Sequence, residues 1–332
     1  MNKLMKTNLD KQELWRIVDS NPALGMISPE IKRNAIERIS GSMYMDLRED
    51  LAFRYCFGQD KESLICLLND ILGENITDLE YLPNQVIGPN LDGKKPIMDV
   101  YCRTPSGEFI CEMQNFRSSD FYDRLLYYGS TVIHSNLKPG NKYRFCPVHI
   151  VAFTNFERSH PAGVPEDRMT FTYRLREDEC HIDMLTGSLA ITLCELPRMK
   201  SVRLEDARTP VEEWFVLFNN IANFAERPAA LPKRLEGILG RAEFMNTDTT
   251  MIAQYIEHIV TQEQIENYTQ PAYEDGLKKG VEIGMEKGRE EGKEEGREEG
   301  REEVARALME QGFDPSVIAK CTGLTVEQIK QL

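Results

Sequence analysis

The chain has 332 residues, 41% of them hydrophobic, and its 40 Lys and Arg against 54 Asp and Glu give a formal net charge of −14. The hydrophobic fraction is enough for a folded core, which excludes a disordered chain, and the length suggests about two domains. The net negative charge argues against a broadly basic surface that coats nucleic acid. The apolar stretches fall short of the ~18 residues of a membrane helix, and the amino terminus lacks a secretory core, so we expect a cytoplasmic protein.

The first part of the chain alternates between helical and strand patterns. Residues 1–44 predict a helical extension, and the helical pattern continues from Asp46 to a helix-ending glycine, Gly73. Short β-rich runs follow, at 80–87, 96–103, 108–116, 145–153, 170–175 and 188–196. One helix separates the third run from the fourth, and Ser118-Ser-Asp120 predicts its N-terminal cap. We therefore predict a mixed α/β core over residues 45–205.

The second part is helical and ends in a repeat. Residues 206–273 predict a helical module, and glycine then recurs at every fourth position from Gly276 to Gly300. Residues 274–303 hold twelve acidic and seven basic side chains, with no apolar residue between Glu286 and Glu303. A helix here has no face to bury, and each glycine costs it ~1 kcal/mol relative to alanine. We interpret residues 274–303 as a solvated, marginally helical spacer, with glycine-mediated helix pairing as the alternative.

The last segment, residues 304–332, predicts a small helical element that resembles a helix-turn-helix. Asp314-Pro315 is a helix start, and Thr325 with Gln328 forms a capping-box pattern. Two lysines cancel two acidic residues from Phe313 onward, and such a neutral module favours dimerisation or docking over DNA reading. We expect a homo-oligomer formed through the C-terminal tail.

The second and third β-rich runs predict a hairpin that carries the chemistry. Thr104-Pro-Ser-Gly107 is a natural four-residue turn between them. Pairing Arg103 with Glu108 fixes the register, because it gathers the apolar partners on one face. These partners are Met98 with Met113, Val100 with Cys111, and Cys102 with Phe109.

The other face of this hairpin places Asp99 opposite Glu112, with Gln114 beside them. Two carboxylates whose Cβ atoms lie ~5 Å apart repel each other by roughly 3 kcal/mol at an effective dielectric of ~20. Either one carboxyl keeps its proton, or a hard divalent cation lies between the two. The ligands are all oxygens, which suits Mg²⁺ or Mn²⁺ better than zinc. From spacing alone, a solvent-exposed face without function is the alternative.

Asp99…Glu112-x-Gln114 resembles the second and third motifs of the PD-(D/E)XK nuclease superfamily. More narrowly, the chain is similar to the recombination-promoting nuclease group, also labelled PD-(D/E)XK nuclease family transposases, from about residue 45 to the end. The matching stretches are Asp50 to Gly58, Asp99 to Gln114, Arg124 to Tyr128 followed by Gly140 and Tyr143, and the glycine-period tail. The resemblance implies a restriction-endonuclease-like core, in which helices flank a mixed central sheet.

The resemblance also implies a Mg²⁺-dependent DNA endonuclease associated with recombination or mobile-element movement. Asp50, with Glu49 as a substitute, matches the acid of the first core helix and is a further candidate ligand. Asp99, Glu112 and the backbone carbonyl of Met113 would hold the metal. Gln114, the fourth catalytic candidate, stands where many members have Lys; its amide can orient water but carries no charge and is no acid or base.

DNA contacts are expected from Arg124, Tyr128, Lys95 and Arg103, with Lys94 beside them. An ion pair with Asp120 is the alternative for Arg124. The core region, residues 40–160, has sixteen acids and twelve bases, so we expect DNA binding to depend on the divalent cation. A catalytically weak or inactive nuclease-like scaffold that binds DNA or a protein is the main alternative. A glycosidase-type carboxylate pair is weaker, because sugar-binding aromatic residues are not expected near the hairpin.

Overall fold

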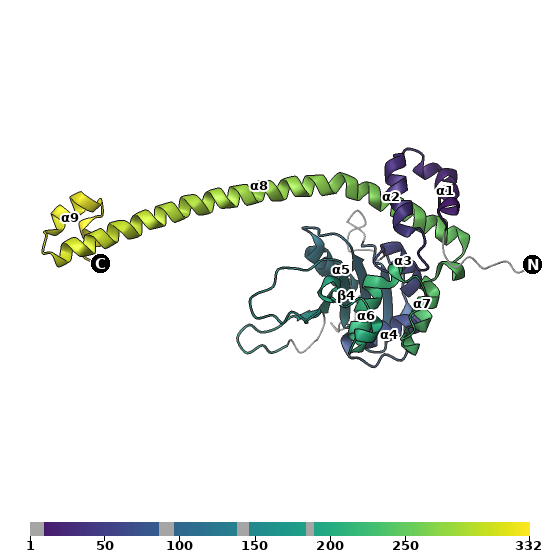
Figure 1. Ribbon diagram of the computed structural model, residues 1–332. Helices are drawn as coiled ribbons and strands as arrows, with labels where there is room; N and C mark the ends of the chain where they lie inside the picture. The colour runs from purple at the N-terminus through teal and green to yellow at the C-terminus, as the bar shows by residue number, and fades with distance from the viewer. Residues whose placement is uncertain (1–9, 86–95, 138–145, 184–188) are drawn as a thin grey trace, which may run out of the picture. The chain divides into compact units, whose positions relative to one another are not determined.

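The computed structural model describes residues 10–85, 96–137, 146–183 and 189–332, with the backbone alone over 266–275 and at 277. The chain divides into two compact units, Met1–Glu263 and Gln264–Leu332 (Figure 1). Within the described residues, none of the helices combines the length and the apolar character needed to cross a lipid bilayer.

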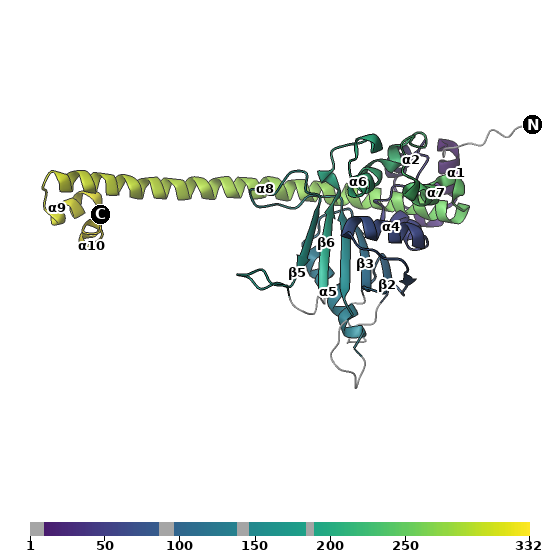
Figure 2. The same cartoon turned by 90° about the horizontal axis from the view of Figure 1, so that it is seen from below.

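A six-stranded mixed sheet forms the centre of the first unit, in the order β1-β2-β3-β4-β6-β5 (Figure 2). The two hairpin-like pairs β1–β2 and β2–β3, and the pair β5–β6, are antiparallel, whereas β3, β4 and β6 run parallel. This helix-flanked sheet confirms the predicted fold class. The strands are β1 Glu80–Tyr81, β2 Val100–Thr104, β3 Gly107–Gln114, β4 Val148–Thr154, β5 Thr170–Arg174 and β6 Leu189–Glu195.

Helix α5 (Phe121–Ser135) connects the parallel strands β3 and β4, as a parallel crossover requires. Its residues Phe121, Leu125, Tyr128 and Val132 recur at helical spacing and are buried against one face of the sheet. Asp120 occupies the predicted N-cap position, but the predicted capping bond is wrong. The backbone of Asp120 has ψ 5° rather than an extended value, and its carboxylate accepts from Ser118 Oγ instead.

The other helices of this unit share one core with the opposite face of the sheet. Phe53, Phe153 and Phe218 meet there, with the rings of Phe153 and Phe218 4.8 Å apart. These helices are α1 Lys11–Ser20, α2 Pro29–Ile39, α3 Asp50–Phe57, α4 Lys61–Leu72, α6 Pro210–Asn220, α7 Glu236–Ala242 and the beginning of α8. Short 3-10 helices are η1 Pro22–Leu24, η2 Leu196–Arg198, η3 Leu204–Asp206, η4 Ile221–Asn223, η5 Lys233–Leu235 and η6 Phe244–Asn246.

The helical pattern from Asp46 to Gly73 forms two helices, α3 and α4. Helix α3 ends at Gly58, and Asp60 caps α4 by accepting from the Ser63 N–H at 3.1 Å. Gly73 ends α4 in the left-handed conformation, at φ 66°, which confirms the predicted glycine cap.

The register of the β2–β3 hairpin is confirmed, with Arg103 opposite Glu108 and Val100 opposite Cys111. The predicted place of Met98 is wrong: it packs in the core beside α5, on the other face from Met113. The cause lies before β2, where the Met98 N–H donates to the Asn84 carbonyl at 2.8 Å instead of continuing the ladder with β3.

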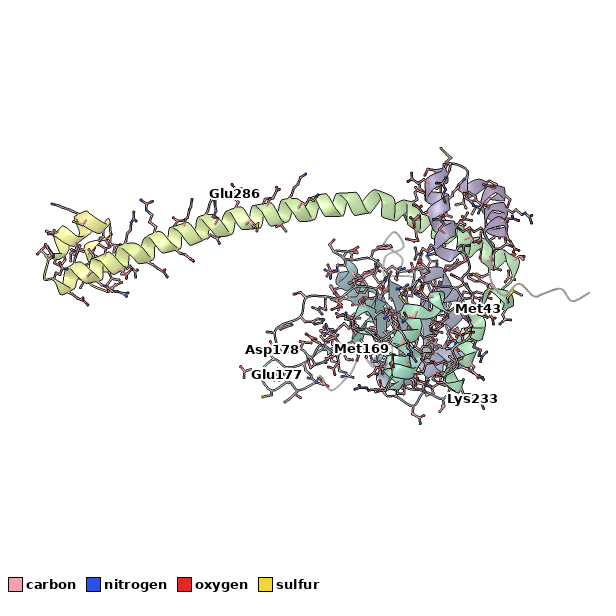
Figure 3. The ribbon with its side chains drawn as sticks, viewed as in Figure 1. Met43, Met169, Glu177, Asp178, Lys233 and Glu286 are labelled. Carbon is pink, nitrogen blue, oxygen red and sulfur yellow. The ribbon has the colours of Figure 1, made fainter. Side chains whose placement is uncertain are left out.

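The second unit contains most of one long helix, α8 (Thr249–Glu310), which continues through every repeat glycine. All the described side chains from Gly276 to Gly300 are exposed, and Glu286 projects from the helix in Figure 3. Helices α9 (Pro315–Thr322) and α10 (Val326–Ile329) pack on the end of α8. The predicted start at Asp314 and the capping box of Thr325 with Gln328 are both confirmed.

Candidate active site

Asp99 and Glu112 lie together at the start of β2 and near the end of β3. The Asp99 N–H donates to Glu112 Oε1 at 3.1 Å, and the Met113 N–H donates to Asp99 Oδ2 at 2.9 Å. Glu112 is only 5% exposed and the Asp99 side chain 13%. The predicted pair is thus brought into contact, through backbone amides that hold each carboxylate in place.

Burial makes the ionised forms of this pair costly. It raises the pKa of Asp99 to about 7, against the opposing effect of the Met113 hydrogen bond. Burial, followed by the charge of Asp99, raises the pKa of Glu112 well above its ordinary range. A cation placed between the two would favour the charged form of both.

Asp50 begins α3 and interacts electrostatically with both members of the pair. Burial raises its pKa, and the charges of His258 and Arg54 oppose that shift. Glu49, the alternative, is buried and already paired with Arg38 and with His258, whose Nε2 lies 3.1 Å from Glu49 Oε2.

Arg54 is a site residue that the sequence analysis missed. Its Nε lies 3.9 Å from Asp99 Oδ1, so it places a positive charge against the carboxylate. The available signal was spacing, because Arg54 follows Asp50 by four residues and therefore shares its face of α3.

Gln114 is bonded at both ends of its amide. Arg124, on α5, donates from Nη2 to Gln114 Oε1, while Gln114 Nε2 donates to the Phe116 carbonyl at 2.8 Å. The Nε atom of Arg124 is buried with no hydrogen-bond partner among the described residues. Arg124 therefore holds a charged group beside Gln114 and turns toward it rather than toward Asp120.

The other predicted DNA contacts are scattered. Tyr128 is buried beneath the pair, and its hydroxyl donates to the Ile97 carbonyl at 3.3 Å. Burial, then the charge of Glu112, raises the pKa of Tyr128 to about 12. Arg103 lies at the opposite end of β2, ~13 Å along the strand from Asp99, in an ion pair with buried Glu108. Lys94, Lys95, Gly140 and Tyr143 lie outside the described residues.

The oxygen atoms that this site offers are the type of ligand that a hard divalent cation prefers. Asp99 and Glu112 offer carboxylate oxygens, and Mg²⁺ is commonly held by one or two carboxylates together with several waters. Across the described residues, no three His, Cys, Asp or Glu side chains gather closely enough to hold a metal ion. The charge of Asp50 therefore acts on Asp99 and Glu112, but its carboxylate does not form a three-carboxylate cluster with them.

A mixed sheet with a buried acidic pair on its central hairpin defines a nuclease-like α/β fold. Residues 47–270, about two thirds of the chain, match the family model described as PD-(D/E)XK nuclease family transposase. The chain therefore belongs to this family.

The end of the chain matches a second model. Residues 298–332 match the C-terminal HTH domain of the Rpn/YhgA-like nuclease family, where HTH denotes helix-turn-helix. No curated protein and no solved structure matched the chain. The two family models together indicate a nuclease-type core followed by a helix-turn-helix domain, which suggests a DNA partner.

Proposed function

We propose that the protein is a Mg²⁺-dependent DNA endonuclease, associated with recombination or mobile-element movement, with Mn²⁺ as an alternative cation. The observation that carries the proposal is the buried contact between Asp99 and Glu112. Two acidic groups placed together away from water require either a proton or a cation, and a nuclease family supplies a reason for the cation.

In this proposal Asp99, Glu112 and the Met113 carbonyl would hold the cation, and Asp50 would add negative charge from α3. When bound, the cation would make a coordinated water more acidic and offset negative charge on the scissile phosphate. Gln114 orients a water or the phosphate through its amide. Arg124 supplies beside it the positive charge that an amide lacks.

Cleavage of supercoiled plasmid tests this proposal. We expect nicking with Mg²⁺ or Mn²⁺, none in EDTA, and none from Asp99→Ala or Glu112→Ala. Glu62→Ala is the matched control, because Glu62 is an exposed acid on α4, and it should cut like the parent. Absence of cleavage on duplex, nicked and single-stranded DNA with either metal would refute the endonuclease.

The alternative is a nuclease-like scaffold that binds DNA or a protein without cutting. A scaffold tolerates Asp99→Asn and gains stability from it, since a repulsion is removed, and its DNA affinity is unchanged by the substitution. The endonuclease loses cleavage with the same variant.

We also propose that the tail joins copies of the chain into a homo-oligomer. The exposure of the described side chains of α8 from Gly276 to Gly300 supports this role, because a helix without buried contacts is marginal in isolation. Sedimentation of the full chain against a version ending at Tyr273 tests it, and equal oligomeric states would contradict it.

A further inference from the structure

Arginine and aromatic side chains form a connected surface beside the candidate active site. It comprises Arg117, Tyr122, Phe156, Arg158 and Tyr173, which we call the arginine–aromatic surface. The guanidinium carbon of Arg158 lies 5.3 Å from the ring centre of Tyr122 and 5.4 Å from that of Tyr173. Its Nη1 also donates to the Tyr173 hydroxyl at 2.6 Å, so one arginine joins a helix residue to a strand residue.

Side-chain contacts of α5, through the buried ring of Phe121, connect this surface to the site. Arg124, which donates to Gln114, lies 5.6 Å from the ring centre of Phe121. Phe121 in turn contacts Tyr122 at 5.2 Å and Phe156 at 6.0 Å between ring centres, and Arg117 lies over Phe156. A chain of direct contacts therefore leads from Gln114 outward to Tyr173.

The sheet explains why these loops meet. Gln114, Thr154 and Glu195 are aligned at the ends of the parallel strands β3, β4 and β6. The segment after β3 carries Arg117 and the segment after β4 carries Arg158, so both leave the sheet at the edge where Gln114 lies. The carboxyl edge of parallel strands is where α/β proteins commonly bind ligands.

The two arginines of this surface form no ion pair within the described parts of the chain. Arg117 is held by the Glu157 carbonyl and the Phe156 ring, and Arg158 by the Tyr173 hydroxyl and two tyrosine rings. The charge of Arg124, closer to the site, instead acts on Asp99 and Glu112. Glu195, a buried acid next to Arg158, is already engaged, because it accepts from His160 at 2.8 Å and from the backbone N–H of Arg158.

Two of the rings are open to solvent as well. Tyr122 is 40% exposed and Tyr173 is 41% exposed, on either side of Arg158. Positive charge interleaved with exposed aromatic rings is the pattern that binds single-stranded nucleic acid, since phosphates meet the charges and unpaired bases stack on the rings. A duplex keeps the faces of its bases inside the stack, so it could use the arginines but not the rings.

We propose that the arginine–aromatic surface binds an unpaired stretch of DNA and leads it to the candidate active site. The proposal rests on the proposed nuclease function and narrows its substrate to DNA that contains a single-stranded segment. Arg117 and Arg158 contact phosphates, and Tyr122 and Tyr173 stack on bases.

The test is the affinity of the full chain for a labelled oligo-dT of about 12 nucleotides and for a duplex of the same length, both in EDTA. We expect Tyr122→Ala combined with Tyr173→Ala to weaken single-strand binding by about tenfold or more, since each stacked base contributes strongly, and to leave duplex binding nearly unchanged. The matched control, Tyr122→Phe with Tyr173→Phe, keeps the rings and should bind like the parent.

Unchanged single-strand affinity in the alanine variant, or an equal loss on both DNA forms, would overturn the proposal. If the alanine variant fails to fold, Arg117→Gln serves instead, because Arg117 is exposed and bonds only a carbonyl. It should lower the slope of log affinity against log salt for the single strand by about 0.7, and an unchanged slope counts against the surface.

Binding in EDTA separates this proposal from the nuclease. If the parent chain cuts plasmid but the alanine variant of the two tyrosines binds the single strand normally, the proposed role of the surface is wrong and the nuclease stands. If the alanine variant loses single-strand binding but the parent chain never cuts DNA, the proposed nuclease activity is wrong and the surface stands.

Discussion

Acidic side chains meet opposite surroundings in the two units of this protein. In the first unit Glu112 is 5% exposed and is held beside Asp99 by backbone amides. In the second unit Glu290, Glu294 and Glu298 stand in solvent on α8. The residue type is the same, and the difference is access to water, which governs what a negative charge costs.

This contrast explains why net charge predicts function poorly here. The total is −14, and the repeat over residues 274–303 carries seven basic and twelve acidic side chains, of which all those described from Lys278 to Glu299 are exposed. The few acids buried at the sheet edge have the greater chemical consequence. Arg117 and Arg158 form no ion pair among the described residues, so an acidic protein still presents a locally cationic surface.

The largest expected effect is on plasmid cleavage, and it compares a buried acid with an exposed one. Glu112→Gln should lower the rate of plasmid cleavage by at least about a hundredfold, because a charged ligand at the reacting phosphate is lost. Glu294→Gln, its matched substitution on α8, should leave the rate unchanged. Equal rates in the two variants would contradict a special role for the buried pair.

The next effect concerns charge beside Gln114. Arg124→Gln should lower the cleavage rate by about 10²-fold, since the positive charge next to the amide is removed. Adding Gln114→Lys to that variant returns a charge to the same place and should recover most of the rate. Single-turnover cleavage measures both, and a double variant as slow as Arg124→Gln would show that Arg124 acts in another way.

A smaller effect is expected on stability without metal. The pKa of Asp99 is about 7 in the folded chain, raised from 3.8 by burial, so the folded state holds more protons between these values. The pKa of Glu112 is shifted in the same direction, so stability should fall as pH rises from about 4 through 7.

Asp99→Asn removes this titration and keeps an acceptor for the Met113 N–H. In EDTA at pH 8 it should raise the free energy of unfolding by on the order of 1–3 kcal/mol, as urea unfolding followed by tryptophan fluorescence would measure. A flat pH profile in the parent chain would contradict the cost of burying this charge.

The smallest effect belongs to the tail. Apart from the helix's own neighbouring backbone, no atom of the described residues lies within 4 Å of a Cβ added at Gly292 or Gly296, so alanine fits at both positions. Each substitution should stabilise the helix by about 1 kcal/mol, which circular dichroism would register as a higher melting temperature of the tail. Loss of helix on substitution would indicate that the glycines contact something, such as a second copy of α8.

The sequence was most informative where a regular pattern had a single physical explanation. The hairpin register followed from Arg103 and Glu108, because a shift by one residue would have moved its apolar side chains to the wrong face. The same argument put Asp99 beside Glu112. It failed at Met98, where the backbone N–H donates to the Asn84 carbonyl. The alternation of apolar and polar residues does not predict which partner the backbone binds at the end of a strand.

Other parts of the site depend on contacts that no local pattern contains. Arg158 meets Tyr122 and Tyr173 only after β4, α5 and β5 have been assembled, and Arg124 meets Gln114 only after α5 folds back on the sheet. Arg103 illustrates the converse, since it is close to Asp99 in sequence and at the far end of the strand in space.

Titration calorimetry of the DNA-free chain with Mg²⁺ and Mn²⁺ tests the central claim most directly, namely that Asp99 and Glu112 together hold a divalent cation. The account predicts saturable binding by the parent chain and by Glu294→Gln, and none by the folded variants Asp99→Asn and Glu112→Gln. Binding of neither metal by the parent chain, or equal binding by all four proteins, would contradict it.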